Sequence, residues 1–174
     1  MRLFRVALVV VTILFHWHPL LYAENGQPVT RIGVLPLQTK MDEQYSYLKS
    51  AVRQMLLSRL ASQPGFEIIE PRALASDPGR VREQLRSNKS AELQQEINAD
   101  LLVDGALYGL KDGIQLNITL YPLSGDTNQT RYSIKTESAD QIMAKITDLA
   151  VQIGQDVAGK EAALAKKEGE GQDQ

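Results

Sequence analysis

The segment between Asp100 and Thr136 constrains the fold most strongly, because it contains three strand patterns in direct succession. The middle pattern places Ile114, Leu116 and Ile118 at every second position with polar residues between them, which is the period of a strand with one buried face. Short turn signals separate the three patterns, which cover residues 101–108, 114–120 and 129–136. Consecutive strands joined by tight turns predict an antiparallel meander.

Strand and helix patterns alternate in the rest of the chain. Before the meander they predict a strand at 31–37, a helix at 42–62, a strand at 66–70 and interrupted helices over 71–99. Asp77 before a proline marks a helix start in the interrupted region, and Ser138 with Gln141 has the spacing of a capping box. The order βα βαα βββ α predicts an α/β (α+β) fold, with helices packed on one mixed sheet of about five strands.

The first 23 residues have the pattern of an export signal. Two arginines precede an apolar core from Val6 to Phe15, and the small residue Ala23 stands before the first acidic residue. Two outcomes stay open, cleavage after Ala23 or retention as a membrane anchor, because residues 6–23 are 18 positions without a charge. In both cases we predict an exported chain, periplasmic or secreted, which contacts the membrane only if the segment is not cleaved.

Removal of residues 1–23 narrows the possible chemistry. His16, Trp17 and His18 leave with the signal, and the chain has no cysteine. Ser-His-Asp and Cys-His catalysis depend on a base that titrates near neutrality, and zinc and copper sites need His or Cys ligands. The sequence also has no glycine motif for phosphate binding. We therefore predict that the chain is not an enzyme and uses no metal or cofactor.

The charge balance argues against nucleic acid as a partner. Arg2 and Arg5 leave with the signal, so 17 of the 19 basic residues face 21 acidic ones, for a net charge of −4. A slightly acidic domain has no overall electrostatic attraction to nucleic acid.

Paired carboxylates remain as a catalytic possibility. Asp100 and Asp104 fall on one side of a strand but about 13 Å apart, which is too far for a retaining glycosidase pair. Asp112 and Asp126 each adjoin a glycine in a turn. We interpret all four as turn or strand-edge residues.

A basic cluster is the sharpest sign of a binding site. Its five members lie within 18 residues: Arg72, Arg80, Arg82, Arg86 and Lys89. Arg82 and Arg86 are four apart, so they share a helix face on which guanidinium groups can hold a phosphate or carboxylate. Arg80, Arg82 and Arg86 are therefore candidate binding residues for an anionic partner. The alternative is a solvated helix face with Glu83 as the ionic partner.

Several motifs resemble those of TolB N-terminal-type domains. They are Ile32–Leu37 (IGVLPL), Met55–Leu60 (MLLSRL), Gly65–Glu70 (GFEIIE), Ala99–Gly105 (ADLLVDG) and Lys111–Leu120, which is followed by Ser124-Gly125. The resemblance covers roughly residues 30–158. The chain departs from the pattern at Leu37, where an aromatic residue is frequent, and at Tyr121-Pro122, where the hairpin usually continues without proline.

The resemblance implies a TolB-N-like domain at 24–158 and a role among periplasmic accessory proteins of the flagellar, curli-secretion and penicillin-binding-protein-activator kinds. Such a role is non-catalytic and consists of contact with an envelope protein or a cell-wall component. The alternative function is a binding module for an anionic small molecule or polymer, through the basic helix face. Residues 159–174, charged and rich in small side chains, predict a disordered tail.

Overall fold

A computed structural model describes residues 29–87, 89–124 and 128–170, so the predicted signal peptide and Asp126 lie outside the described residues. The strands are β1 (Thr30–Val34), β2 (Gln38–Lys40), β3 (Phe66–Ile69), β4 (Leu101–Leu110), β5 (Gly113–Pro122) and β6 (Thr130–Thr136). The helices are the 3-10 turn η1 (Glu43–Tyr45), α2 (Ser46–Ala61), α3 (Arg72–Ser76), α4 (Pro78–Arg86), α5 (Ser90–Ile97) and α6 (Ala139–Glu170).

The six strands form one mixed sheet in the order β3-β1-β4-β5-β6, with β2 paired to the distal part of β4. β1 runs parallel to both β3 and β4, and β4, β5 and β6 are the antiparallel meander that the sequence predicts. The mixed α/β fold class is therefore confirmed.

The strand predicted at 31–37 ends early, and a second strand follows it after a proline. β1 ends at Val34, Pro36 has no N–H to contribute to a strand pair, and β2 then pairs Gln38 with Ala106, farther along β4. The sequence pattern misses β2 because its three residues, Gln-Thr-Lys, contain no apolar alternation. The sheet consequently has six strands where about five are predicted.

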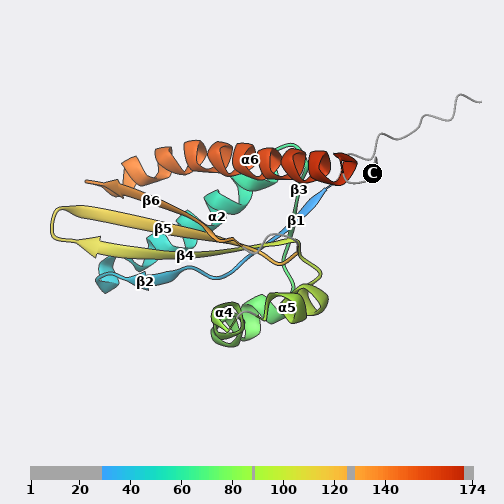
Figure 1. Cartoon of the computed structure of the whole chain (residues 1–174). Coiled ribbons are helices and arrows are strands. Elements are labelled where there is room, and N and C mark those ends of the chain that lie inside the picture. The colour runs from blue at the N-terminus through green and yellow to red at the C-terminus, as the bar shows by residue number, and fades with distance from the viewer. Residues whose placement is uncertain (1–28, 88, 125–127, 171–174) are drawn as a thin grey trace, which may run out of the picture.

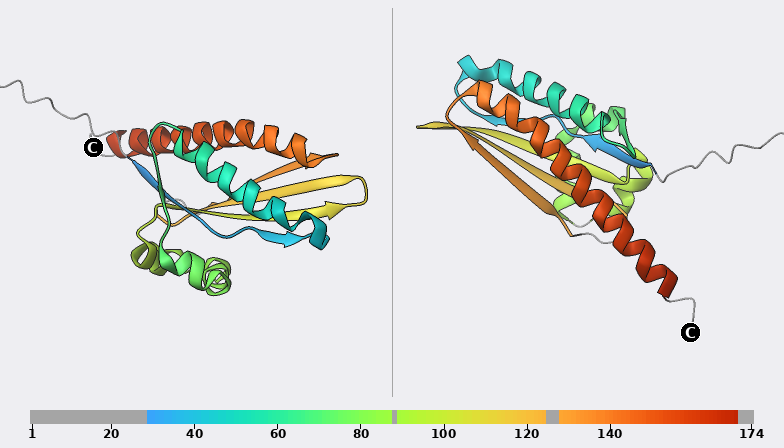
Figure 2. Two further views of the ribbon diagram at one scale, coloured as in Figure 1. Left: turned by 180° about the vertical axis from the view of Figure 1, so that it is seen from behind. Right: turned by 90° about the horizontal axis from the view of Figure 1, so that it is seen from above.

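Helices α2 and α6 pack on one face of the sheet, at an angle to each other (Figures 1 and 2). The inward residues of β4 and β5 meet them, and Gly105 permits close packing, because a Cβ there would lie 2.4 Å from Leu37. The main core lies in this layer, with the fully buried side chains Val52, Leu56, Leu60, Val103, Leu107, Leu116, Ile142, Ile146 and Ile153 among its members.

The short helices α3, α4 and α5 cover only part of the other face, at the end where β1 and β4 begin (Figure 1). They bury a second core that consists of Leu35, Leu74, Val81, Leu85, Leu93, Ile97, Ala99, Leu102 and Leu123. The predicted cap of α4 is confirmed, since Asp77 Oδ1 accepts from the backbone N–H of Arg80 at 2.9 Å.

Helix α6 continues through Glu170, whereas the sequence predicts disorder from Gly159. The difference has a local cause, because the extra residues are mainly Ala, Lys and Glu, which favour helix, and include no proline. At the other end of α6, the Ser138 hydroxyl accepts from the Gln141 N–H at 3.4 Å, as the capping-box spacing predicts. Among the described helices, α6 included, none combines the length and apolarity needed to span a bilayer.

Candidate functional site

The distal half of the sheet has a face that none of the described helices covers (Figures 1 and 2). Strand register aligns its side chains in rows, for example Ala106 with Asn117 and Asn117 with Ser133. This open sheet face forms a hollow of about 480 Å³. We define it by eight residues: Gln38, Ala106, Tyr108, Gln115, Asn117, Thr119, Arg131 and Ser133.

Neutral polar side chains at the centre of the open sheet face hold one another in place. The Gln115 amide donates to Asn117 Oδ1 at 2.9 Å and to the Ser133 hydroxyl at 3.0 Å. The Ser133 hydroxyl also donates to Asn117 Oδ1, at 2.8 Å. These groups offer hydrogen bonds to a partner but have no proton to exchange near neutral pH, so the centre suits recognition better than acid–base chemistry.

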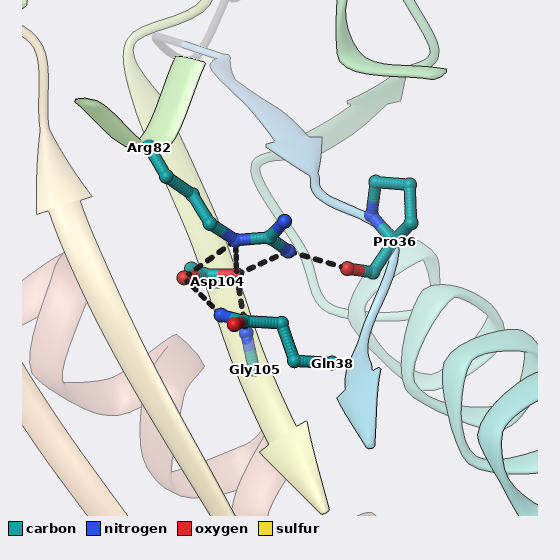
Figure 3. Close-up of polar contacts among 5 residues, drawn as sticks. All are labelled: Pro36, Gln38, Arg82, Asp104 and Gly105. Atoms are coloured by element: carbon teal, nitrogen blue, oxygen red, sulfur yellow. Dashed lines mark hydrogen bonds and ion pairs between the residues drawn. The ribbon is translucent and has the colours of Figure 1, made fainter. Parts of the chain in front are cut away.

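An ion pair marks the border between the open sheet face and the part covered by helices (Figure 3). Arg82 of α4 donates to Asp104 of β4 from Nε at 3.0 Å and from Nη2 at 2.9 Å, and Nη2 also donates to the Pro36 carbonyl at 2.6 Å. Asp104 accepts in addition from the Gly105 N–H at 3.0 Å. Both side chains are only 14% exposed, so the pair ties α4 to the sheet where little water reaches it.

The other predicted anion-binding residues have partners of their own. Arg80 donates to Glu96 of α5 at 2.5 Å, and this hydrogen bond raises the pKa of Arg80 and lowers that of Glu96. Arg86 lies 3.9 Å from Glu83 and is 69% exposed. Arg82 reaches the sheet while Arg86 stays in solvent, so the two do not form the clamp that their spacing suggests. Arg80 and Arg82 are compensated by carboxylates from other elements.

Each described aspartate among the predicted carboxylate candidates is paired with a different cation. Asp100 accepts from the Arg31 backbone N–H at 2.9 Å and pairs with its guanidinium at 3.2 Å, which raises the pKa of Arg31. Asp104 forms its ion pair with Arg82. Asp112 accepts a hydrogen bond from Lys135 at 3.1 Å, which lowers the pKa of Asp112. Within the described part of the chain, no group of three or more potential ligands can hold a metal ion.

A larger hollow, of about 1670 Å³, lies at the tip of the β4–β5 hairpin near the starts of α2 and α6. Two exposed aromatic residues, Tyr45 and Tyr47, border it. Positively charged lysines and negatively charged carboxylates also line it. The mixed charges favour no single class of ligand.

Sequence reasoning missed the open sheet face, although a signal for it is present. The alternation that identifies the buried side of β5 also identifies Gln115, Asn117 and Thr119 as its outward set. The pattern does not show that the helical layer ends before it covers these three residues.

No protein-family model matches the chain, and no curated protein matches it in sequence. Among solved structures, the hypothetical protein CT253 from Chlamydia trachomatis is similar at 15% identity and a TM-score of 0.46, over 63% of this chain and 73% of that one. The lipoprotein GNA1162 from Neisseria meningitidis has 14% identity and a TM-score of 0.43, over 71% and 96%. TolB from Acinetobacter baumannii has 12% identity and a TM-score of 0.44, and the similarity spans 74% of this chain but 28% of that protein. TolB, whose N-terminal-type domain the sequence resembles, is thus one of the similar solved structures.

Proposed function

We propose that this chain is a non-catalytic interaction module of the bacterial cell envelope, which binds an envelope protein or a cell-wall component through the open sheet face. The observation that supports this most directly is the neutral network of Gln115, Asn117 and Ser133 at the centre of an uncovered sheet. Fixed donors and acceptors on a rigid scaffold recognise a partner at a low cost in side-chain entropy.

The location in the envelope rests on the N-terminal pattern. An apolar core of about ten residues after two arginines is typical of a signal that directs export. The same pattern supports a periplasmic or secreted location, with membrane attachment only if the signal is retained.

The alternative function, an anion-binding module on α4, has less support. Arg80 and Arg82 already donate to Glu96 and Asp104, so an anion would have to displace a carboxylate from each. Arg86 is the member of the three whose ionic contact, at 3.9 Å, is weak.

The test is capture of a partner from envelope extracts, with the tagged chain as bait. Asn117→Arg places a long cation at the centre of the open sheet face, where it breaks the bonds to Gln115 and Ser133. Ser50→Arg is the matched control, because it adds the same charge at an exposed position on α2, on the opposite side of the sheet. We expect Asn117→Arg to reduce the recovered partner at least about tenfold and Ser50→Arg to leave it unchanged.

A parallel sedimentation of both variants with purified cell-wall material separates the two classes of partner. Loss of co-sedimentation in Asn117→Arg alone identifies the wall, and loss of capture in the extract alone identifies a protein. Equal behaviour of the two variants in both assays would refute the open sheet face as the binding surface.

A further inference from the structure

β6 has an unpaired outer edge. It is the last strand in the sheet order, and no described strand pairs with its outer side. The Thr136 carbonyl points inward to β5. It lies so close to Gly113 of β5 that a Cβ added there would be 2.0 Å from the carbonyl oxygen. Since backbone groups alternate in direction along a strand, those of Arg131, Ser133 and Lys135 point outward. Lys145 of α6 confirms this direction, as its ammonium donates to the Lys135 carbonyl at 3.4 Å.

A groove of about 390 Å³ runs between this edge and α6. Its apolar part consists of Tyr132, Ile134 and Leu149, and Leu149 is almost fully buried. Every second side chain of a strand added to β6 would enter this groove, because successive side chains of a strand point to opposite faces. The edge therefore offers both backbone partners and a place for apolar side chains.

The side chains on the other face of β6 are cationic. Arg131 and Lys135 stand four residues apart on the side of β6 that continues the open sheet face, with Ser133 between them, and all three are exposed. Lys135 shares an exposed contact with Asp112, whereas Arg131 has no carboxylate partner among the described residues. Lys145 adds a third cation beside the edge, and Asp148 contributes one carboxylate to the same groove.

This charge pattern argues against a second copy of the chain as the natural occupant. Two β6 strands paired in antiparallel fashion about Ser133 would place each Arg131 opposite a Lys135. Like charges directly opposite one another destabilise a strand pair, and cations on edge strands are a known defence against self-association.

We propose that the β6 edge binds an extended segment of a partner protein with carboxylates four residues apart, a small polar residue midway between them, and apolar residues at the two alternate positions. The carboxylates meet Arg131 and Lys135, and the apolar residues enter the groove over Ile134 and Leu149. Backbone pairing supplies affinity, and the alternate side chains supply specificity. This inference rests on the proposed function and specifies the kind of partner that the open sheet face receives.

The probe is a fluorescent peptide of sequence Ser-Glu-Val-Thr-Val-Glu-Ser, titrated with the purified chain and followed by anisotropy. A peptide with Lys in place of both Glu residues is its charge-reversed counterpart. The double variant Arg131→Glu, Lys135→Glu should exchange the preference. We expect it to weaken binding of the Glu peptide at least about tenfold and to strengthen binding of the Lys peptide.

Ser133→Pro tests backbone pairing, because it removes an outward N–H from an edge strand, a position where proline is tolerated. We expect it to abolish binding of the Glu peptide, while Ser133→Ala retains it. Circular dichroism establishes that each variant is folded. Unchanged binding by Ser133→Pro, or no exchange of preference by the double variant, would overturn strand addition at β6.

Sedimentation of the chain alone tests for the competing occupant, a second copy, since a dimer that Ser133→Pro abolishes would show that β6 pairs with itself.

The two proposals can also fail separately. If neither peptide binds but partner capture still depends on Asn117, the open sheet face stands and the β6 inference is wrong. If the peptide binds and Asn117→Arg leaves capture unchanged, the β6 inference stands and the open sheet face is not the binding surface.

Discussion

The two halves of one sheet face differ in what lies over them, and β4 crosses from one half to the other within seven residues. Leu102 is fully buried under α3–α5, and Asp104 stands at the border. Ala106 and Tyr108, the next two residues on the same side of β4, are half-buried and have no described helix above them. The helical layer ends at the first charged residue of this row.

The two halves also differ in how they contribute to stability. The covered half buries apolar surface from three short helices, and such burial is the main favourable contribution to folding. The open half holds polar groups that bond to each other or to water, so they contribute little net free energy to folding. Under the function proposed above, this polar half is the one that receives a partner.

The largest expected effect comes from removing apolar contact in the covered half. Leu93 of α5 is fully buried, and Leu93→Ala should lower the free energy of unfolding by about 3–4 kcal/mol, from lost burial and the cavity left behind. Asn117→Ala, in the open half, should change it by less than about 1 kcal/mol, because water replaces the lost hydrogen bonds. Urea unfolding measures both. Losses of similar size would show that the open half also supports the fold.

The border pair is expected to rank second. Arg82→Ala leaves Asp104 with little solvent and without its cation, which should cost about 2–3 kcal/mol. Arg86→Ala removes an arginine from the same helix, but one that is 69% exposed and 3.9 Å from its partner, so it should cost less than about 0.5 kcal/mol. If the two variants unfold at the same urea concentration, the border pair does not hold α4 to the sheet.

The cap of α4 ranks third. Asp77→Ala removes the acceptor for the Arg80 N–H and should lower the free energy of unfolding by about 1 kcal/mol. Asp77→Asn keeps an acceptor at the same place and should retain most of the stability. Thermal or urea unfolding distinguishes the two, and a full loss in the Asn variant would mean that the negative charge, not the cap, is what matters.

The sequence predicts the meander and the buried sides of its strands because those depend on local alternation, as for Ile114, Leu116 and Ile118 in β5. It predicts the start of α4 because Asp77 caps a helix within three residues. It does not predict β2, whose partner Ala106 is 68 positions away from Gln38 and whose residues have no apolar pattern.

The candidate site depends even more on long-range contacts. The spacing of Arg82 and Arg86 predicts a shared helix face, but Asp104, 22 residues from Arg82, draws one guanidinium to the sheet. Nothing local identifies that pairing, because Asp104 also fits the role of a strand-edge residue.

The smallest expected effect concerns the pair that joins α4 to α5 at the outer surface of the covering layer. The hydrogen bond from Arg80 lowers the pKa of Glu96, so the pair stabilises the fold above the ordinary carboxylate range, and this stabilisation is lost as the pH falls through the lowered pKa. Arg80→Gln should return the pKa of Glu96 to its ordinary range, as an NMR titration of its side-chain carboxyl carbon would show.

The stability difference between the wild type and Arg80→Gln should be present near neutral pH and shrink in acid. Because the two side chains are 42% and 39% exposed, added salt should also reduce it. A difference that grows in acid would mean that Arg80 stabilises the covering layer through some contact other than Glu96.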